Sequence, residues 1–459
     1  MRLWQRCMTI GAITLGGALT SGVAAADTLS LTQALEMGMQ KSPNVRSAKY
    51  RTESAEAQTS AARAPYLPSL SLSGTFEVGG NYVDGSRLSQ QPNGTFVEVA
   101  GTQAPGSPFN PAATYRTRPT ATARISWTVW DFGKTSNNVA AADANRDAAS
   151  ANEKETSLQI ASSIASAYLS VFYQDRFLEL ANATLQSRDK LNAITKGLVK
   201  NGIQPPMEEI RAGSRLEAAR RDAERAKAGA DDARMRLALA LGMEPAASGG
   251  IRVTQPRLPR PNVDSTTALK EAEEKRPQLL AAQKTADAKV AAKDAAWAGY
   301  LPNVFVTATG TLSAPKQDPL EFAQKTRDGA LLIGVSEQWD FGISPRVDAA
   351  KADQAAAEAD LEATRRDTKS DALSAAISVR ATGAQLDHAR KAEEGTQAVR
   401  AIVEARYIRG LSSPLELIDA EDSDIDARQT RIQTELDHAL AIVRLCVATG
   451  RPITEEAAQ

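Results

Sequence analysis

The feature that most constrains the fold is an internal duplication of the chain. The stretch around Pro43 that ends in Tyr66-Leu67-Pro68 recurs, without a gap, around Pro277 and ends there in Tyr300-Leu301-Pro302. Further markers recur later in the same order: Trp130-Asp131-Phe132-Gly133 as Trp339-Asp340-Phe341-Gly342, and Gly202, Pro206 and Gly242 as Gly410, Pro414 and Gly450. Two copies with one order of elements predict two structurally related units.

The markers divide the chain into segments. We expect a signal peptide at 1–26, a first repeat at 27–245, a proline-rich linker at 246–263, a second repeat at 264–452 and a C-terminal tail at 453–459. The first repeat is the longer one, because a Gly/Pro/Asn-rich loop from Asn93 to Pro111 lies between its strand markers.

The N-terminus has the parts of a secretory signal peptide. Arg2 and Arg6 precede an apolar stretch, and Ala24-Ala25-Ala26 offers a small-residue cleavage site. The alternative is a retained membrane anchor, but the apolar stretch is short for a span of about 20 residues. Cleavage would remove Cys7 and leave Cys446 as the one cysteine, so the mature chain could form no internal disulfide.

Within each repeat the hydrophobic period changes twice. Residues 31–64 have a helix-favouring composition broken only at Pro43, and after Pro68 apolar and polar residues alternate as in a strand with one apolar face. A second alternating run, 120–129, leads into a proline-free stretch, 134–200, with the three- and four-residue spacing of a coiled coil. The second repeat shows the same order, with alternation at 304–312 and 331–335 and helix-favouring sequence at 343–408.

The segment lengths suggest how the helices pack. A helix over 134–200 would be about 100 Å long at a rise of 1.5 Å per residue. The two shorter helices of that repeat, 31–64 and 207–241, together have about the same length and could stack end to end beside it. Segments 265–298 and 414–448 could do the same beside 343–408, which predicts a column of paired helices.

Four strands of about ten residues suit an outer-membrane barrel. Four strands cannot close alone, and an open edge in lipid is prohibitive, so chains would share one barrel: two would supply eight strands and three would supply twelve. The aromatic residues at the strand ends suit an interfacial girdle: Trp127, Trp130, Trp339 and Phe341. The alternative is an ordinary sheet packed on helices. The predicted fold class is mainly α with a β-barrel part, built from long coiled-coil hairpins and four transmembrane strands per chain.

The composition excludes several function classes. The 54 Lys and Arg residues against 55 Asp and Glu residues give a net charge of −1, without the basic stripe of a nucleic-acid-binding protein. Two histidines and two cysteines leave little for a metal centre, a cofactor or nucleophilic catalysis. No Gly-rich phosphate loop is present, so we expect no nucleotide hydrolysis. Because no clustered catalytic constellation is visible, we also expect no enzyme activity and no cofactor.

A signal peptide followed by two copies of helix, hairpin, long helix and helix resembles the TolC family of outer-membrane channels. The resemblance covers the chain from about Leu29 to Pro452. It implies a homotrimer with a twelve-stranded barrel in outer-membrane lipid and a helical tunnel in the periplasm. Such channels are passive and work with a proton-driven or ATP-driven inner-membrane pump and a periplasmic adaptor. The adaptor would dock on the helical tips, marked by Gly202, Pro206, Gly410 and Pro414.

The resemblance also implies a gate at those tips. A tyrosine three residues before the second tip glycine is a family lock position, here Tyr407, and its partner carboxylate is Glu208. A phenol that donates to a carboxylate is a charge-assisted bond worth about 1.5–3 kcal/mol where water is excluded. The family's basic lock residue is replaced by Ser412, so Arg409 or Arg211 could serve instead.

Glu416 and Asp419 stand three residues apart and share one helical face. On spacing alone they could form a solvated acidic face. The resemblance to the family's acidic pair implies a ring of carboxylates at the pore entrance, which would favour cations.

The expected function is a passive exit duct for small molecules such as drugs, across the periplasm and the outer membrane. The alternative is the outer-membrane component of a type I protein secretion system. A periplasmic adaptor ranks lower because adaptors lack two duplicated strand hairpins, and a purely structural envelope protein also ranks lower. The sequence does not specify the cargo.

Overall fold

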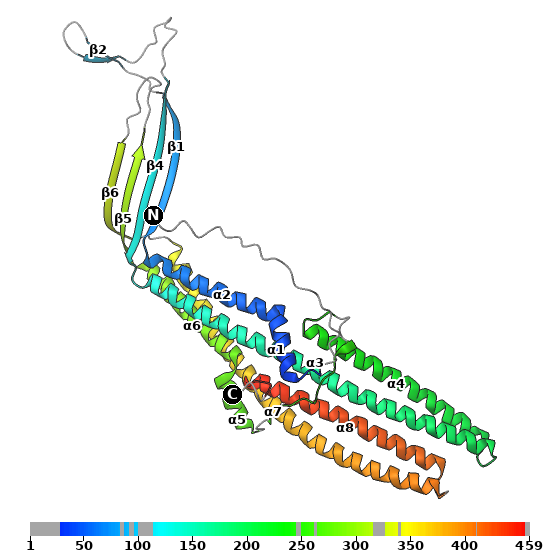
Figure 1. Ribbon diagram of the computed structural model, residues 1–459. Coiled ribbons are helices and arrows are strands. Elements are labelled where there is room, and N and C mark those ends of the chain that lie inside the picture. The colour runs from blue at the N-terminus through cyan, green and yellow to red at the C-terminus, as the bar shows by residue number, and fades with distance from the viewer. Residues whose placement is uncertain are drawn as a thin grey trace.

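The computed structural model describes residues 28–82, 87–90, 96–99, 113–244, 249–260, 264–314, 326–337, 341–409 and 411–454. The molecule is elongated, with a β-sheet at one end, the sheet end, and two helical hairpins at the other, the tip end (Figure 1). The predicted signal peptide, Trp339, Gly410 and residues 455–459 lie outside the described residues.

The first repeat contributes α1 (Leu31–Lys41), α2 (Pro43–Arg63), a 3₁₀ turn (Ala64–Tyr66), β1 (Ser69–Tyr82), β2 (Arg87–Gln90), β3 (Phe96–Val99), β4 (Ala113–Trp130), α3 (Lys134–Lys200) and α4 (Pro206–Ala240). The second repeat contributes α5 (Ser265–Lys275), α6 (Pro277–Trp297), a 3₁₀ turn (Ala298–Tyr300), β5 (Asn303–Ser313), β6 (Thr326–Ser336), α7 (Ile343–Ile408) and α8 (Pro414–Thr449). The expectation of a mainly helical chain with a small sheet is confirmed.

Proline breaks the first helical segment of each repeat in two. Ser42 and Arg276 have extended backbone angles, with ψ of 121° and 119°, and the next helix starts at the proline that follows. The pyrrolidine ring disfavours the helical conformation of the residue before it and fits the first position of a helix. The pairs α1–α2 and α5–α6 therefore replace the nearly continuous helices expected over 31–64 and 265–298.

The shorter helices stack end to end along the long ones, as their lengths predict. Helix α3 packs against α2 near the sheet end and against α4 near the tip end, and α7 packs in the same way against α6 and α8 (Figure 1). The joints are repeated: a Cβ on Gly242 would lie 3.0 Å from the Lys41 side chain, and one on Gly450 would lie 2.7 Å from the Lys275 carbonyl oxygen. Contacts of α3 with α6 and α8 join the two repeats.

The sheet is antiparallel in the order β1-β4-β5-β6. Its register places Leu70 beside Ile125, Ile125 beside Ala308 and Ala308 beside Leu331, so one face is continuously apolar. The opposite face is rich in serine and threonine. Strands β1 and β4 have 14 and 18 residues, longer than the expected ten or so, whereas β5 and β6 have 11 each. Among the described strands, none pairs with the outer edge of β1 or of β6.

The long loop of the first hairpin contains two short strands that the sequence analysis did not predict. Strands β2 and β3 pair with each other and form a separate two-stranded ribbon beyond the main sheet (Figure 1). Asn93-Gly94, a frequent hairpin turn pair, lies between them in the sequence. Most of the predicted loop from Asn93 to Pro111 lies outside the described residues.

The hydrophobic core, here called the central cluster, lies halfway along the column, where α1, α5 and the C-terminal ends of α4 and α8 meet α3 and α7. Its most buried members include Ile164, Tyr168, Leu169, Leu237, Leu241, Val379 and Val443. The Tyr168 hydroxyl lies 2.8 Å from the carbonyl oxygens of both Leu29 and Thr254, and so ties the start of the first repeat to the inter-repeat segment. No helix within the described residues is both long and apolar enough to cross a membrane.

Candidate functional site at the helical tips

The first tip is the turn between α3 and α4. Gly202 has a φ of 69°, and its amide donates to Val199 O at 3.0 Å while Ile203 N donates to Leu198 O at 2.9 Å. This pattern of bonds closes a helix C-terminus through a left-handed residue, a role that favours glycine. Pro206 is the first residue of α4, where its missing N–H costs nothing.

The second tip is the turn between α7 and α8. Ser413 caps α8 by accepting a hydrogen bond from Glu416 N at 3.2 Å, and Pro414 is the first residue of the helix. Leu411 N donates back to Arg406 O at 2.9 Å. The predicted tip residue Gly410 lies outside the described residues.

The predicted lock residues Tyr407 and Glu208 line one cavity between α3, α4, α7 and α8. Burial raises the pKa of the Tyr407 phenol, and the negative charge of Glu208 raises it further. Among the hydrogen bonds of the described residues, none joins the two side chains. Arg211 instead donates to the Glu208 carboxylate at 2.8 Å. The structure therefore brings the pair together, with the carboxylate held by arginine.

Ser412, at the position where the resemblance implied a basic residue, donates its hydroxyl to the Glu416 carboxylate. Glu416 and Asp419 are both exposed at the start of α8. Arg409, one candidate for the missing basic residue, is exposed and makes no ion pair with any described residue. Arg211, the other candidate, is engaged with Glu208.

A buried arginine that the sequence analysis missed lies beside this cavity. Arg188 of α3 has 5% of its side chain exposed, and it contacts Glu421 at 2.6 Å and Asp422 at 2.5 Å, both on α8. Arg215 of α4 reaches Asp422 from the other side at 3.4 Å. Burial raises the pKa of Glu421, and the positive charges of Arg188 and Arg400 oppose that shift.

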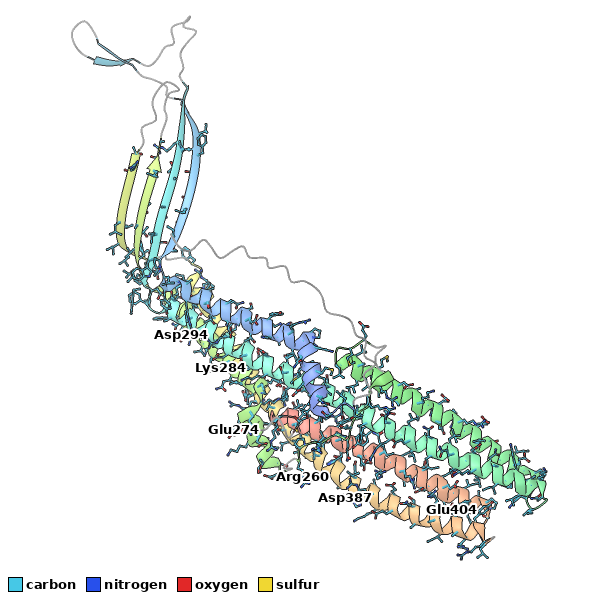
Figure 2. The ribbon with its side chains drawn as sticks, viewed as in Figure 1. Arg260, Glu274, Lys284, Asp294, Asp387 and Glu404 are labelled. Atoms are coloured by element: carbon cyan, nitrogen blue, oxygen red, sulfur yellow. The ribbon has the colours of Figure 1, made fainter. Side chains whose placement is uncertain are left out.

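A second missed cluster lies next along α8. Asp424, with 4% of its side chain exposed, contacts Arg400 of α7 at 3.2 Å and Arg428 of its own helix at 3.1 Å. Charged side chains occur along the whole column, from Asp294 near the sheet end to Glu404 near the tips (Figure 2). An acidic stretch such as Glu421-Asp422 is usually a solvated face, so its pairing with a buried arginine could have been suspected only from the arginines on facing helices.

The described members of the predicted interfacial aromatic set, Trp127, Trp130 and Phe341, lie where the sheet meets the helices. Trp127 donates from Nε1 to Tyr66 O at 3.0 Å, and Trp130 contacts the Phe132 ring edge to face, with 6.1 Å between centroids. Trp127, Trp130 and Phe341 are exposed, and Trp339 lies outside the described residues.

The described residues offer little for metal or thiol chemistry. They contain no group of three or more His, Cys, Asp or Glu side chains placed to hold a metal ion. Cys446 is buried in the central cluster, and burial raises the pKa of its thiol to about 11, which disfavours the reactive thiolate.

Known proteins match both the sequence and the fold. Residues 34–243 and 268–451 match the family described as outer membrane efflux protein. The fold is similar to VceC from Vibrio cholerae, with 20% identity, a TM-score of 0.74, and 92% of this chain and 96% of that one covered. It is also similar to the open state of MtrE from Neisseria gonorrhoeae, with 20% identity, a TM-score of 0.70 and coverage of 92% and 89%.

A curated relative, nodulation protein T from Rhizobium leguminosarum bv. trifolii, is 28% identical over 182 residues, which are 40% of this chain and 34% of that protein. The family match covers both repeats and both tips, and it agrees with the resemblance drawn from the sequence markers. The chain belongs to the outer membrane efflux protein family, whose members are non-enzymatic conduits located in the outer membrane.

Proposed function

We propose that the chain forms a homotrimeric, passive exit duct for small molecules such as drugs. The observation that carries this proposal is a sheet with one continuous apolar face and two edges that no described strand pairs with, mounted on helices about 100 Å long. Unpaired backbone groups are very costly in lipid, so the edges of β1 and β6 require strands from other chains. Three chains would supply the twelve strands of a closed wall.

In this arrangement the apolar face of the sheet contacts outer-membrane lipid, and its serine- and threonine-rich face lines the water-filled opening. Trp127, Trp130, Trp339 and Phe341 would lie at the membrane–water interface. The helices would extend into the periplasm, and their tips, at Gly202, Pro206, Gly410 and Pro414, would dock on a periplasmic adaptor. Exposed apolar side chains near those tips support a docking role: Ile203, Met207, Leu411 and Leu415.

The tips would also close the duct at rest. Tyr407 and Glu208 line a shared cavity, which suits a lock between the second hairpin and the first. The exposed carboxylates Glu416 and Asp419 would form the acidic ring at the entrance and favour cations. Because the duct itself hydrolyses nothing, an inner-membrane pump would supply the energy.

The test is a strain that lacks this gene, challenged with a panel of dyes, antibiotics and detergents while its culture supernatant is profiled. Increased sensitivity with an unchanged supernatant, reversed by re-expression of the full chain, is the expected result. Loss of particular secreted proteins with unchanged sensitivity would instead identify the exit component of a type I secretion system. No change in either readout would contradict an export function.

A further inference from the structure

Arg188 differs from the other charged residues near the tip end because it is buried and its partners belong to the other repeat. It lies on α3, about 20 Å from the Gly202 turn at 1.5 Å per residue. Both of its partners, Glu421 and Asp422, are on α8. The contact therefore joins the first hairpin, α3–α4, to the second hairpin, α7–α8.

The surroundings of this contact extend to all four helices of the tip end. Ser187 of α3 lies 3.5 Å from Glu421, and Arg215 of α4 lies 3.4 Å from Asp422. The charges of Arg400 and Glu404 on α7 also act on Glu421. If the two hairpins separated at this level, the Arg188 guanidinium would lose both carboxylates and the charge-assisted hydrogen bonds that it donates to them.

Arg215 of α4 also reaches across to Asp422, but its side chain is 30% exposed, and the remaining arginine candidates near the tips do not bridge the hairpins. Arg211 pairs with Glu208 on its own helix, and Arg409 is exposed without an ion pair among the described residues. Ser412, where the family has a basic residue, precedes α8 and donates to Glu416, the third residue of that helix. A buried, bridging arginine is therefore present, but it comes from α3.

We propose that Arg188 is the positioning residue that holds α8 against the first hairpin and so keeps the tips closed, in place of the basic residue absent at Ser412. This inference rests on the proposed duct and its gate at the tips. Arg188 acts through Glu421 and Asp422, which place α8, and with it the acidic pair Glu416 and Asp419, at the pore entrance.

The test is single-channel recording of the purified full chain in planar bilayers. Arg188→Leu should raise the conductance of the resting channel several-fold, because α8 loses its buried ion pairs with α3 near the tips. The double variant Glu421→Gln with Asp422→Asn removes the same link from the other side and should have the same effect. The two sets combined should add nothing further, because partners in one contact are not additive.

Arg176→Leu is the matched control. Arg176 pairs with Glu435 at 2.8 Å across the same α3–α8 interface, but its side chain is 38% exposed and it lies farther from the tips. This variant should keep the wild-type conductance, and Arg188→Lys, which retains the charge but not the two-pronged geometry, should fall between wild type and Arg188→Leu.

Wild-type conductance in both Arg188→Leu and the Glu421–Asp422 double variant would overturn the assignment, and so would an equal increase in Arg176→Leu, which would indicate general loosening. If Arg188→Leu does not assemble, the Glu421–Asp422 double variant still tests the same contact from the α8 side. Absence of conductance from the wild type and from every variant would refute the proposed channel itself, and this inference with it.

Discussion

The two halves of helix α8 meet the same neighbours, α3 and α7, with different side chains: the tip half adds charged residues to buried apolar ones such as Leu417 and Ile418, whereas the other half is mostly apolar. From Leu436 to Cys446 the inward positions are mostly apolar and belong to the central cluster. From Glu421 to Glu435, charged residues follow one another at steps of three and four and pair with arginines or acids on the facing helices or on α8 itself: Glu421, Asp424, Arg428, Arg431 and Glu435. In both halves of α8 the inward positions are three and four residues apart, but they form an apolar interface in one half and a largely ionic one in the other.

The two kinds of contact contribute differently to the fold: apolar contacts stabilise it, whereas ion pairs specify how the helices are arranged. Apolar burial stabilises a fold with little regard for direction, by about 25 cal/mol per Å² removed from water. Partly buried ion pairs add little net stability, because desolvation offsets attraction, but they specify which groups must face each other. The middle of the column therefore holds the protomer together, whereas the tip half is held in one arrangement by contacts that can be exchanged. This suits the half in which the proposed gate lies.

The largest loss of stability is expected in the central cluster. Leu237 of α4 is fully buried there, so Leu237→Ala should cost about 2–5 kcal/mol, the sum of lost apolar burial and a residual cavity. Leu239→Ala, two residues away at an exposed position, is the matched control and should change the stability by less than about 0.5 kcal/mol. Thermal unfolding of the two variants measures the difference, and equal effects would contradict the placement of the core.

A smaller loss of stability is expected in the charged part of α8 from Glu421 to Glu435, here called the ionic half. Asp424→Asn keeps the shape of the side chain but removes the charge that Arg400 and Arg428 share, which should cost about 1.5–3 kcal/mol. Asp426→Asn changes an exposed acid on the same helix and should be nearly neutral. If both variants unfold at the wild-type temperature, the inward-facing charges are not part of the interface and the comparison between the two halves fails.

The order of helices and strands could be predicted from the sequence because it depends on local residue preferences, and the same residues recur in both repeats. Pro43 and Pro277 end the preceding helix and can begin the next one, Gly202 permits a left-handed turn, and alternation after Pro68 indicates a strand with one apolar face. The pairing of Tyr407 with Glu208 stays a prediction from the family resemblance: the two line one cavity, but no hydrogen bond between the described residues joins them. Each of these inferences needed only neighbours in sequence or a matched motif.

The ionic half of α8 could not be predicted, because its charges have the spacing of both an inward stripe and a solvated face. Only the positions of Arg188 on α3 and Arg400 on α7, far away in the sequence, distinguish the two. Strands β2 and β3 were missed for another reason: the composition around Asn93-Gly94 was interpreted as a loop although this dipeptide is also a hairpin turn signal.

The two repeats offer a finer comparison at the ends of α4 and α8. Gly242 and Gly450 have φ of 65° and 68°, so alanine at either position should be strained by about 1–2 kcal/mol. At Gly450 the added Cβ would also lie 2.7 Å from a backbone oxygen, Lys275 O, whereas at Gly242 it would meet a flexible side chain at 3.0 Å. Gly450→Ala should therefore lower the unfolding temperature more than Gly242→Ala, and the reverse order would show that the two joints are packed differently.

The smallest effect is expected at His438 on α8, near the boundary between the two halves. Its Nδ1 lies 3.0 Å from Thr382 Oγ1 on α7. Burial lowers the pKa of the imidazole, the nearby Arg390 charge lowers it further, and Asp387 opposes the shift.

Because the pKa of His438 is lower in the folded protein than in the unfolded chain, its contribution to stability is present above the unfolded value of about 6.5 and is lost as the pH falls through the folded value. His438→Gln keeps a group that can bond to Thr382 but cannot take up the proton. Its loss of unfolding temperature between about pH 7.5 and pH 5 should be slightly smaller than that of the wild type. His388→Gln, at an exposed position on α7, should follow the wild-type curve. A steeper acid dependence in His438→Gln would mean that the charged imidazole is favoured at the α7–α8 interface, and that the ionic half of α8 extends to His438.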